Sequence, residues 1–150
     1  MFRRTALTAS LAAVLAFTGA HALADGHGAK PDPAKERQTL MSNVGMATGT
    51  GAKMLKGEIE FDALAAQMVM KTLHSAALGF GYMFPEGSES GHETEAAPAI
   101  WSDRAGFDAQ VAKFQADTDA KIADLDGFKA AFGAATANCG TCHKQYRIKK

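Results

Sequence analysis

The amino-acid sequence predicts an all-α protein, an antiparallel four-helix bundle. Three observations favour this fold: four segments carry apolar residues at helical spacing, no segment alternates in the manner of a strand, and short links join the first two and the last two segments. The 150 residues, 47% of them hydrophobic, suffice for one domain with its own core. Sixteen basic side chains balance sixteen acidic ones, so the composition gives no electrostatic reason to expect nucleic acid as a partner.

The first 24 residues have the layout of a secretory signal peptide. Arg3 and Arg4 form a positive start, an apolar run covers residues 6–17, and residues 22–24 form a small-residue cleavage site. The run is too short to span a bilayer, which disfavours an uncleaved anchor and any stable membrane insertion. We therefore predict a mature domain at residues 25–150, exported to the periplasm by the general secretory route rather than the twin-arginine route.

The first two helices are predicted from capping residues and apolar spacing. Asp32, followed by proline, begins a helix that runs toward Lys56, and a second helix covers about residues 62–80. The apolar residues expected in the core are Leu40, Val44, Leu55, Phe61, Leu64, Met68, Leu73 and Ala76. An irregular stretch at residues 81–100, rich in Gly, Ser, Glu and Pro, follows them and separates the two pairs of helices.

The last two helices carry the clearest apolar stripes. The third begins near Asp103, and Asp126 is a candidate cap for the fourth. On the third helix the stripe is expected to contain Phe107, Val111, Phe114, Thr118, Ile122 and Leu125. On the fourth, residues at steps of three and four form the seam of a bundle helix: Phe128, Phe132, Ala135, Cys139, Cys142 and Tyr146. Both cysteines of the chain therefore lie in this seam.

Residues 139–143 read Cys-Gly-Thr-Cys-His, the pattern of covalent haem attachment. On a helix, Cys139, Cys142 and His143 project from one face, so that two thiols can bond the haem vinyl groups while the imidazole reaches the iron. The alternatives fit less well: a redox dithiol needs a preceding strand, a zinc site needs a fourth ligand, and a disulfide between i and i+3 strains a helix. We predict one haem c, with His143 as the proximal iron ligand.

The chain resembles the class II cytochromes c, the cytochrome c′ family. The signal peptide, the four helices and the position of the attachment motif carry the resemblance. The similar segments are Arg37-Gln38-x-x-Met41, Lys56-Gly57-Glu58, Ala99-Ile100-Trp101 and Cys139-x-x-Cys142-His143-x-x-Tyr146-Arg147. The resemblance implies a haem within the bundle, attached to the last helix and faced by the first, and a homodimer that packs through the first two helices.

The resemblance also implies roles for individual residues. Met41 lies where the family faces the distal side of the iron, and Arg37, one turn earlier, is suited to pairing with a haem propionate. The residues expected to border the propionates are Gln38, Ser88 and Glu89. Arg147, one turn beyond His143, would approach the proximal imidazole or the haem edge, with a solvated basic helix end as the alternative.

The second axial position separates two functions. With Met41 bound, the iron is six-coordinate and low-spin, and the protein is an electron carrier that docks a redox protein partner. With Met41 as ordinary packing, a five-coordinate high-spin iron binds a small gas such as nitric oxide or carbon monoxide. We favour the carrier, because a thioether beside an open iron site is a competent ligand. A haem enzyme is disfavoured, since His74 is the sole mid-helix histidine outside the motif. The lysines considered for a docking patch are Lys53, Lys56, Lys144, Lys149 and Lys150.

Overall fold

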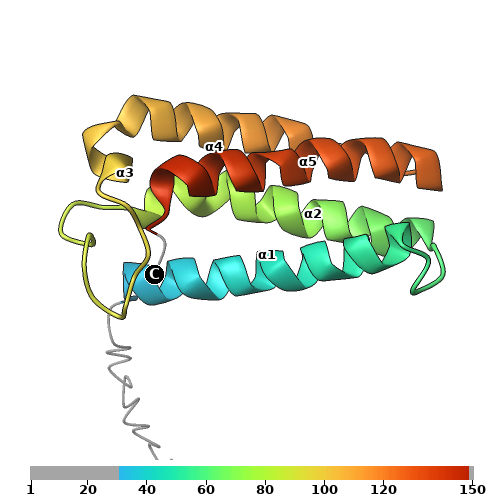
Figure 1. Ribbon diagram of the computed structural model, residues 1–150, viewed down its shortest axis with the longest axis horizontal. Coiled ribbons are helices and arrows are strands. Elements are labelled where there is room, and N and C mark those ends of the chain that lie inside the picture. The colour runs from blue at the N-terminus through green and yellow to red at the C-terminus, as the bar shows by residue number, and fades with distance from the viewer. Residues whose placement is uncertain (1–30, 149–150) are drawn as a thin grey trace, which may run out of the picture. The chain divides into compact units, whose positions relative to one another are not determined.

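The computed structural model describes residues 31–148, so the predicted signal peptide at residues 1–24 lies outside the described residues. The described part is helical, and its long helices form an antiparallel bundle (Figure 1), which confirms the predicted fold. The helices are α1 (Pro33–Leu55), α2 (Ala63–Phe80), the 3₁₀ turn η1 (Gly81–Met83), α3 (Ala99–Ser102), α4 (Arg104–Thr118) and α5 (Leu125–Tyr146). Within this part of the chain, no helix is both long and apolar enough to cross a membrane.

Aspartates begin all four long helices. The carboxylate of Asp32 accepts hydrogen bonds from the backbone N–H groups at the start of α1, and those of Asp62 and Asp103 do the same for α2 and α4. For α5 the prediction of Asp126 was wrong, because Asp124 accepts the N–H of the third residue of that helix at 2.8 Å. Asp126 lies instead in the first turn, where a carboxylate also favours a helix N-terminus.

The core face of α2 differs from the predicted one. Leu73 and Ala76 are buried as expected, whereas Leu64 and Met68 are exposed. The buried residues of α2 are Ala66, Val69, Met70, Leu73, Ala76 and Ala77. All of these except Ala77 belong to the core cluster that contains Phe128 of α5. Contact with the neighbouring helices therefore determines which face of α2 is buried, and that face is rotated away from the two exposed residues.

The third predicted stripe is too long, because α4 ends at Thr118. Its hydroxyl donates to the Phe114 carbonyl at 2.8 Å, within the last turn. Ile122 is buried in the link that follows, and Leu125 begins α5 with its side chain exposed. Gln67 on α2 holds this link by accepting the N–H of Ile122 at 2.8 Å and donating to the Ala120 carbonyl at 3.1 Å.

Candidate haem site

The attachment motif lies on an unbroken stretch of α5. Both Cys139 and Cys142 are free thiols and half-buried, and Cys142 packs against the aromatic cluster that contains Phe107 and Tyr146. Burial raises the pKa of both thiols, that of Cys142 to about 11. The helix thus presents both sulfurs from one side, as covalent attachment requires.

His143 is exposed in the last turn of α5. Partial burial of the ring and the nearby Arg147 guanidinium lower the pKa of His143, while Glu95 raises it. A lowered pKa favours the neutral imidazole, which is the form that binds a metal. Two free thiols and this imidazole, at i, i+3 and i+4 of one helix, form a donor set that fits a covalently attached haem.

Met41 lies on the face of α1 that turns toward the core. Its side chain is half-buried and packs against the cluster of α1, α2 and α5 that includes Val44 and Phe132. Met46, five residues further along α1, is exposed. The two methionines therefore differ in environment, and Met41 is the one directed into the bundle.

Arg37 is buried, at 4% exposure, and its guanidinium holds the segment between η1 and α3. Nη1 donates to the Met83 carbonyl at 2.9 Å and to Ser88 Oγ at 3.0 Å, and Nη2 donates to the Ser88 carbonyl at 2.8 Å and to Thr94 Oγ1 at 3.2 Å. The guanidinium carbon also lies 4.7 Å from the centroid of the Phe84 ring. These bonds use four of the five N–H donors of Arg37, and its pairing with a haem propionate stays a prediction.

The other residues assigned to the propionates lie around the same segment. Ser88 is buried and bonded to Arg37, whereas Gln38 is exposed and its Nε2 donates to the His92 carbonyl at 2.7 Å. Glu89 is exposed, and its carboxylate accepts the N–H of Gly87 at 3.0 Å. The structure therefore brings Arg37, Ser88 and Gln38 together at one end of the bundle, and their contact with haem stays a prediction.

Arg147 ends α5 and pairs with the loop before α3. Its Nε lies 2.6 Å from Glu95 Oε2, and its backbone forms an isolated antiparallel bridge with Ala96. This ion pair is a partner that the sequence interpretation did not identify. Arg147 lies within one turn of His143, and its approach to the imidazole or to the haem edge stays a prediction.

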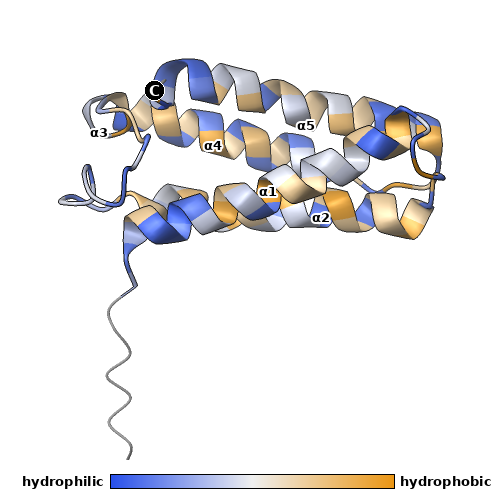
Figure 2. Cartoon of the chain, turned by 60° about the horizontal axis from the view of Figure 1, so that its bottom comes forward, coloured by the Kyte–Doolittle hydropathy of each residue, from blue (hydrophilic) through white to orange (hydrophobic). Residues whose placement is uncertain are grey.

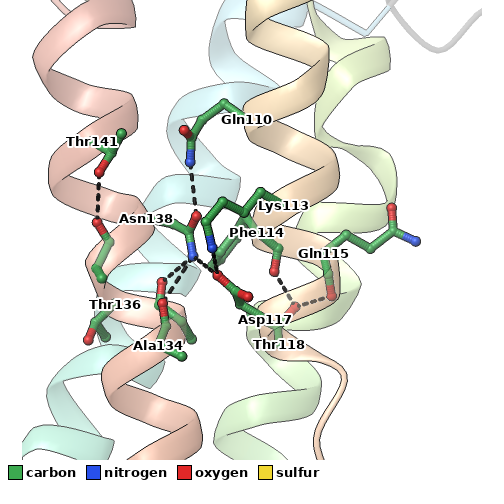
Figure 3. A network of polar contacts seen from close by, with 12 residues as sticks. Gln110, Lys113, Phe114, Gln115, Asp117, Thr118, Ala134, Thr136, Asn138 and Thr141 are labelled. Atoms are coloured by element: carbon green, nitrogen blue, oxygen red, sulfur yellow. Dashed lines mark hydrogen bonds and ion pairs between the residues drawn. The ribbon is translucent and has the colours of Figure 1, made fainter.

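A polar network around the buried Asn138 precedes the attachment motif and was missed from the sequence. Asn138, next to Cys139, donates to Asp117 Oδ2 at 2.7 Å and accepts from Gln110 Nε2 at 2.9 Å, while Lys113 pairs with the same carboxylate at 2.5 Å (Figure 3). The hydrogen bond from Lys113 and that from Asn138 lower the pKa of Asp117. The network fixes α4 against α5 one residue before the first thiol. Asn138 is off the apolar seam, so periodicity gave no signal for its burial.

The other candidates from the sequence are His74 and the lysines of the predicted docking patch. His74 Nδ1 lies 3.1 Å from the Gln115 carbonyl and 3.2 Å from Thr118 Oγ1, which makes it a tie between α2 and α4. Lys53 and Lys56 lie at the far end of α1 from Lys144, which is in the last turn of α5 (Figure 1). The prediction of a single lysine patch was therefore wrong. Lys149 and Lys150 lie outside the described residues.

Comparison with known proteins gives consistent results. The family described as Cytochrome C′ matches residues 32–147. A cytochrome c-556 of Agrobacterium fabrum (strain C58) is 40% identical over 120 residues, which is 77% of this chain and 81% of the relative. The solved structure of cytochrome c′ from Rhodopseudomonas palustris matches with a TM-score of 0.76 at 35% identity, over 81% of this chain and 99% of that one. The structure of oxidised cytochrome c556 from R. palustris matches with a TM-score of 0.70 at 29% identity, over 79% and 98%.

The family match covers almost all of the described residues, and it includes the attachment motif on α5. Proteins of this family carry one covalently attached haem c and act as electron carriers. The donor set of two free thiols and an imidazole agrees with that cofactor. The chain therefore belongs to the cytochrome c′ family, the class II cytochromes c.

Proposed function

We propose that this protein is an exported electron carrier of the periplasm, with His143 and Met41 as the axial ligands of a low-spin haem c. When bound, the haem supplies an iron that takes up and releases one electron. Cys139 and Cys142 hold the group covalently, and His143 binds the iron from α5. The observation that carries the proposal is the half-buried position of Met41, which faces the bundle interior from α1.

Two properties of Met41 support ligation. A thioether is a soft ligand that iron accepts, and the unbranched, flexible side chain of methionine adjusts readily to its surroundings. A methionine ligand also favours the reduced state of iron, which raises the reduction potential. The runner-up function, binding of nitric oxide or carbon monoxide at a five-coordinate iron, requires Met41 to remain packed against the core.

The test compares two methionine variants of the haem-loaded protein. We expect the oxidised wild type to show a sulfur-to-iron charge-transfer band and the reduced wild type to bind carbon monoxide slowly. Met41→Leu abolishes the band and accelerates carbon monoxide binding, while Met46→Leu, on the exposed side of the same helix, preserves both. A high-spin wild type that binds carbon monoxide rapidly supports the gas-binding function and contradicts ligation by Met41.

We further propose a homodimer that packs through α1 and α2. Met46, Leu64 and Met68 are 64%, 72% and 58% exposed, and Figure 2 shows hydrophobic residues along α2 on this side. A groove between α1 and α2, lined by Val44, Met68 and their neighbours, adjoins them. In a two-fold dimer, this apolar face of one copy packs against the same face of the second copy, and both are removed from water.

A further inference from the structure

Residues 84–97, here named the brace, cross from α1 to α5 at the end of the bundle that carries the attachment motif (Figure 1). The brace begins after η1 and leads into α3. It makes hydrogen bonds to both helices, and these helices carry the two proposed iron ligands. The residues of α1 and α5 to which the brace is hydrogen-bonded indicate its role.

On the α1 side the attachment is Arg37, one turn before Met41. The guanidinium donates to both oxygens of Ser88 and to Thr94 Oγ1, and both Arg37 and Ser88 are buried, at 4% and 7% exposure. A buried guanidinium is costly unless its donors are paired, so the contact strongly favours one arrangement of the loop. The first turns of α1 are thereby fixed to the middle of the brace.

On the α5 side the attachment lies within one turn beyond His143. The N–H of Ala97 donates to the Tyr146 carbonyl at 3.0 Å, and the N–H of Ile148 donates to the Glu95 carbonyl at 2.8 Å. The Arg147–Glu95 ion pair reinforces this short backbone pairing. The last turn of α5 is thereby fixed to the end of the brace.

Between Ser88 and Thr94, the two residues of the brace that bond to Arg37, the backbone adopts an unfavourable conformation. His92 and Glu93 have φ values of 47° and 51°, in the left-handed region that residues other than glycine seldom adopt. Gln38 holds the His92 carbonyl, and the His92 ring lies 2.7 Å from Asp32, the residue that caps α1. Such a backbone persists when its surroundings determine it, so the brace is a formed element.

We propose that the brace is a positioning element that sets the separation of α1 and α5 at the iron, and so keeps Met41 bound. The helices also touch at Gly51 and Phe132, ten residues along α1 from Met41, or about 15 Å at the rise of an α-helix. The brace supplies the second point of fixation, one turn from each ligand. This inference rests on the proposed ligation by Met41.

The test loosens the brace at Thr94, which is not among the residues assigned to haem. Thr94→Val removes the acceptor of an Arg37 N–H and of the Ala96 N–H. Carbon monoxide binding by the reduced, haem-loaded protein is measured by flash photolysis. Because binding requires release of Met41, we expect the association rate to rise at least about fivefold, since loss of a single hydrogen bond already produces a population shift of that size. Thr94→Ser, which keeps the hydroxyl, restores the wild-type rate.

Gln67→Leu is the matched control. Gln67 holds the link at the opposite end of the bundle through two hydrogen bonds, so its loss destabilises the fold without touching the brace. We expect its carbon monoxide rate to match the wild type, and amide exchange at Ala97 and Ile148 to accelerate in Thr94→Val alone. An unchanged carbon monoxide rate in Thr94→Val with accelerated exchange overturns the brace proposal. A wild type without the charge-transfer band overturns ligation by Met41, and the brace proposal with it.

Discussion

Gly51 decides how closely α1 approaches α5. A Cβ at this position would lie 2.5 Å from Phe132 Cε2 and 3.1 Å from Phe128 Cζ. Both rings are buried in the core and pack against each other in a tilted arrangement at a centroid distance of 5.2 Å, so neither has room to retreat. The glycine is thus required by close approach rather than by backbone conformation, although a mid-helix glycine lowers helix propensity.

Substitution of alanine for Gly51 and for Gly49 should have opposite effects on the free energy of unfolding. A methyl group at Gly49 would meet no neighbouring element within 4 Å, so Gly49→Ala should stabilise the protein by about 0.5–1 kcal/mol through helix propensity. Gly51→Ala should destabilise it by about 1–3 kcal/mol, because the methyl group overpacks the two rings. Denaturant unfolding of both haem-loaded variants measures the difference. Equal stabilisation by both would show that the rings move aside at little cost.

At the scale of the helices, local signals were readable from the sequence and non-local ones were not. The starts of α1, α2 and α4 follow from Asp32, Asp62 and Asp103, because a cap bonds to residues two or three positions away. The buried face of α2 was misjudged at Leu64 and Met68, since which stripe faces inward depends on the neighbouring helices.

The same distinction applies to the candidate site. The motif residues are neighbours on one helix, so their shared face follows from spacing alone. The partners of Arg37 lie 46–57 residues away, and those of Asn138 on α4 lie 21–28 residues away. No local pattern encodes such pairs. The brace and the polar network therefore emerged from the structure.

The α4–α5 network should make stability depend on pH through Asp117. Its hydrogen bonds from Lys113 and Asn138 lower the pKa of the folded carboxyl below its unfolded value. The resulting stabilisation is present above the unfolded pKa of about 3.9 and is lost as pH falls through the lower, folded pKa.

Asp117→Asn removes this dependence while it keeps the size of the side chain. The free energy of unfolding should be lower in Asp117→Asn than in the wild type at pH 7, and the two values should converge at acid pH. Asp108→Asn serves as the control, because its ion pair with Arg104 is exposed and contributes little. Parallel curves for the wild type and Asp117→Asn down to about pH 2 would contradict a lowered pKa.

At the scale of the whole molecule, the apolar surface is uneven. The exposed residues Leu64, Met68, Leu78 and Tyr82 recur at helical spacing along the outer side of α2 and η1. In an isolated chain this apolar stripe stays exposed to water, which is unfavourable. In a two-fold dimer the stripe is buried against the same stripe of the second copy. The attachment motif lies on α5, whereas this stripe lies on α2 and η1, so the proposed dimer would cover α2 rather than the helix that carries the motif.

A charge in the middle of this stripe should therefore dissociate the dimer and spare the haem site. Met68→Glu places a carboxylate where the two copies meet, and desolvation of that charge opposes association. Sedimentation velocity at micromolar concentration should show a dimer for the wild type and a monomer for Met68→Glu, with identical absorption spectra. Leu125→Glu, at an exposed apolar residue that begins α5, should remain dimeric. If Leu125→Glu dissociates while Met68→Glu stays dimeric, the interface lies on the α5 side, because only a buried charge carries the penalty that separates the copies.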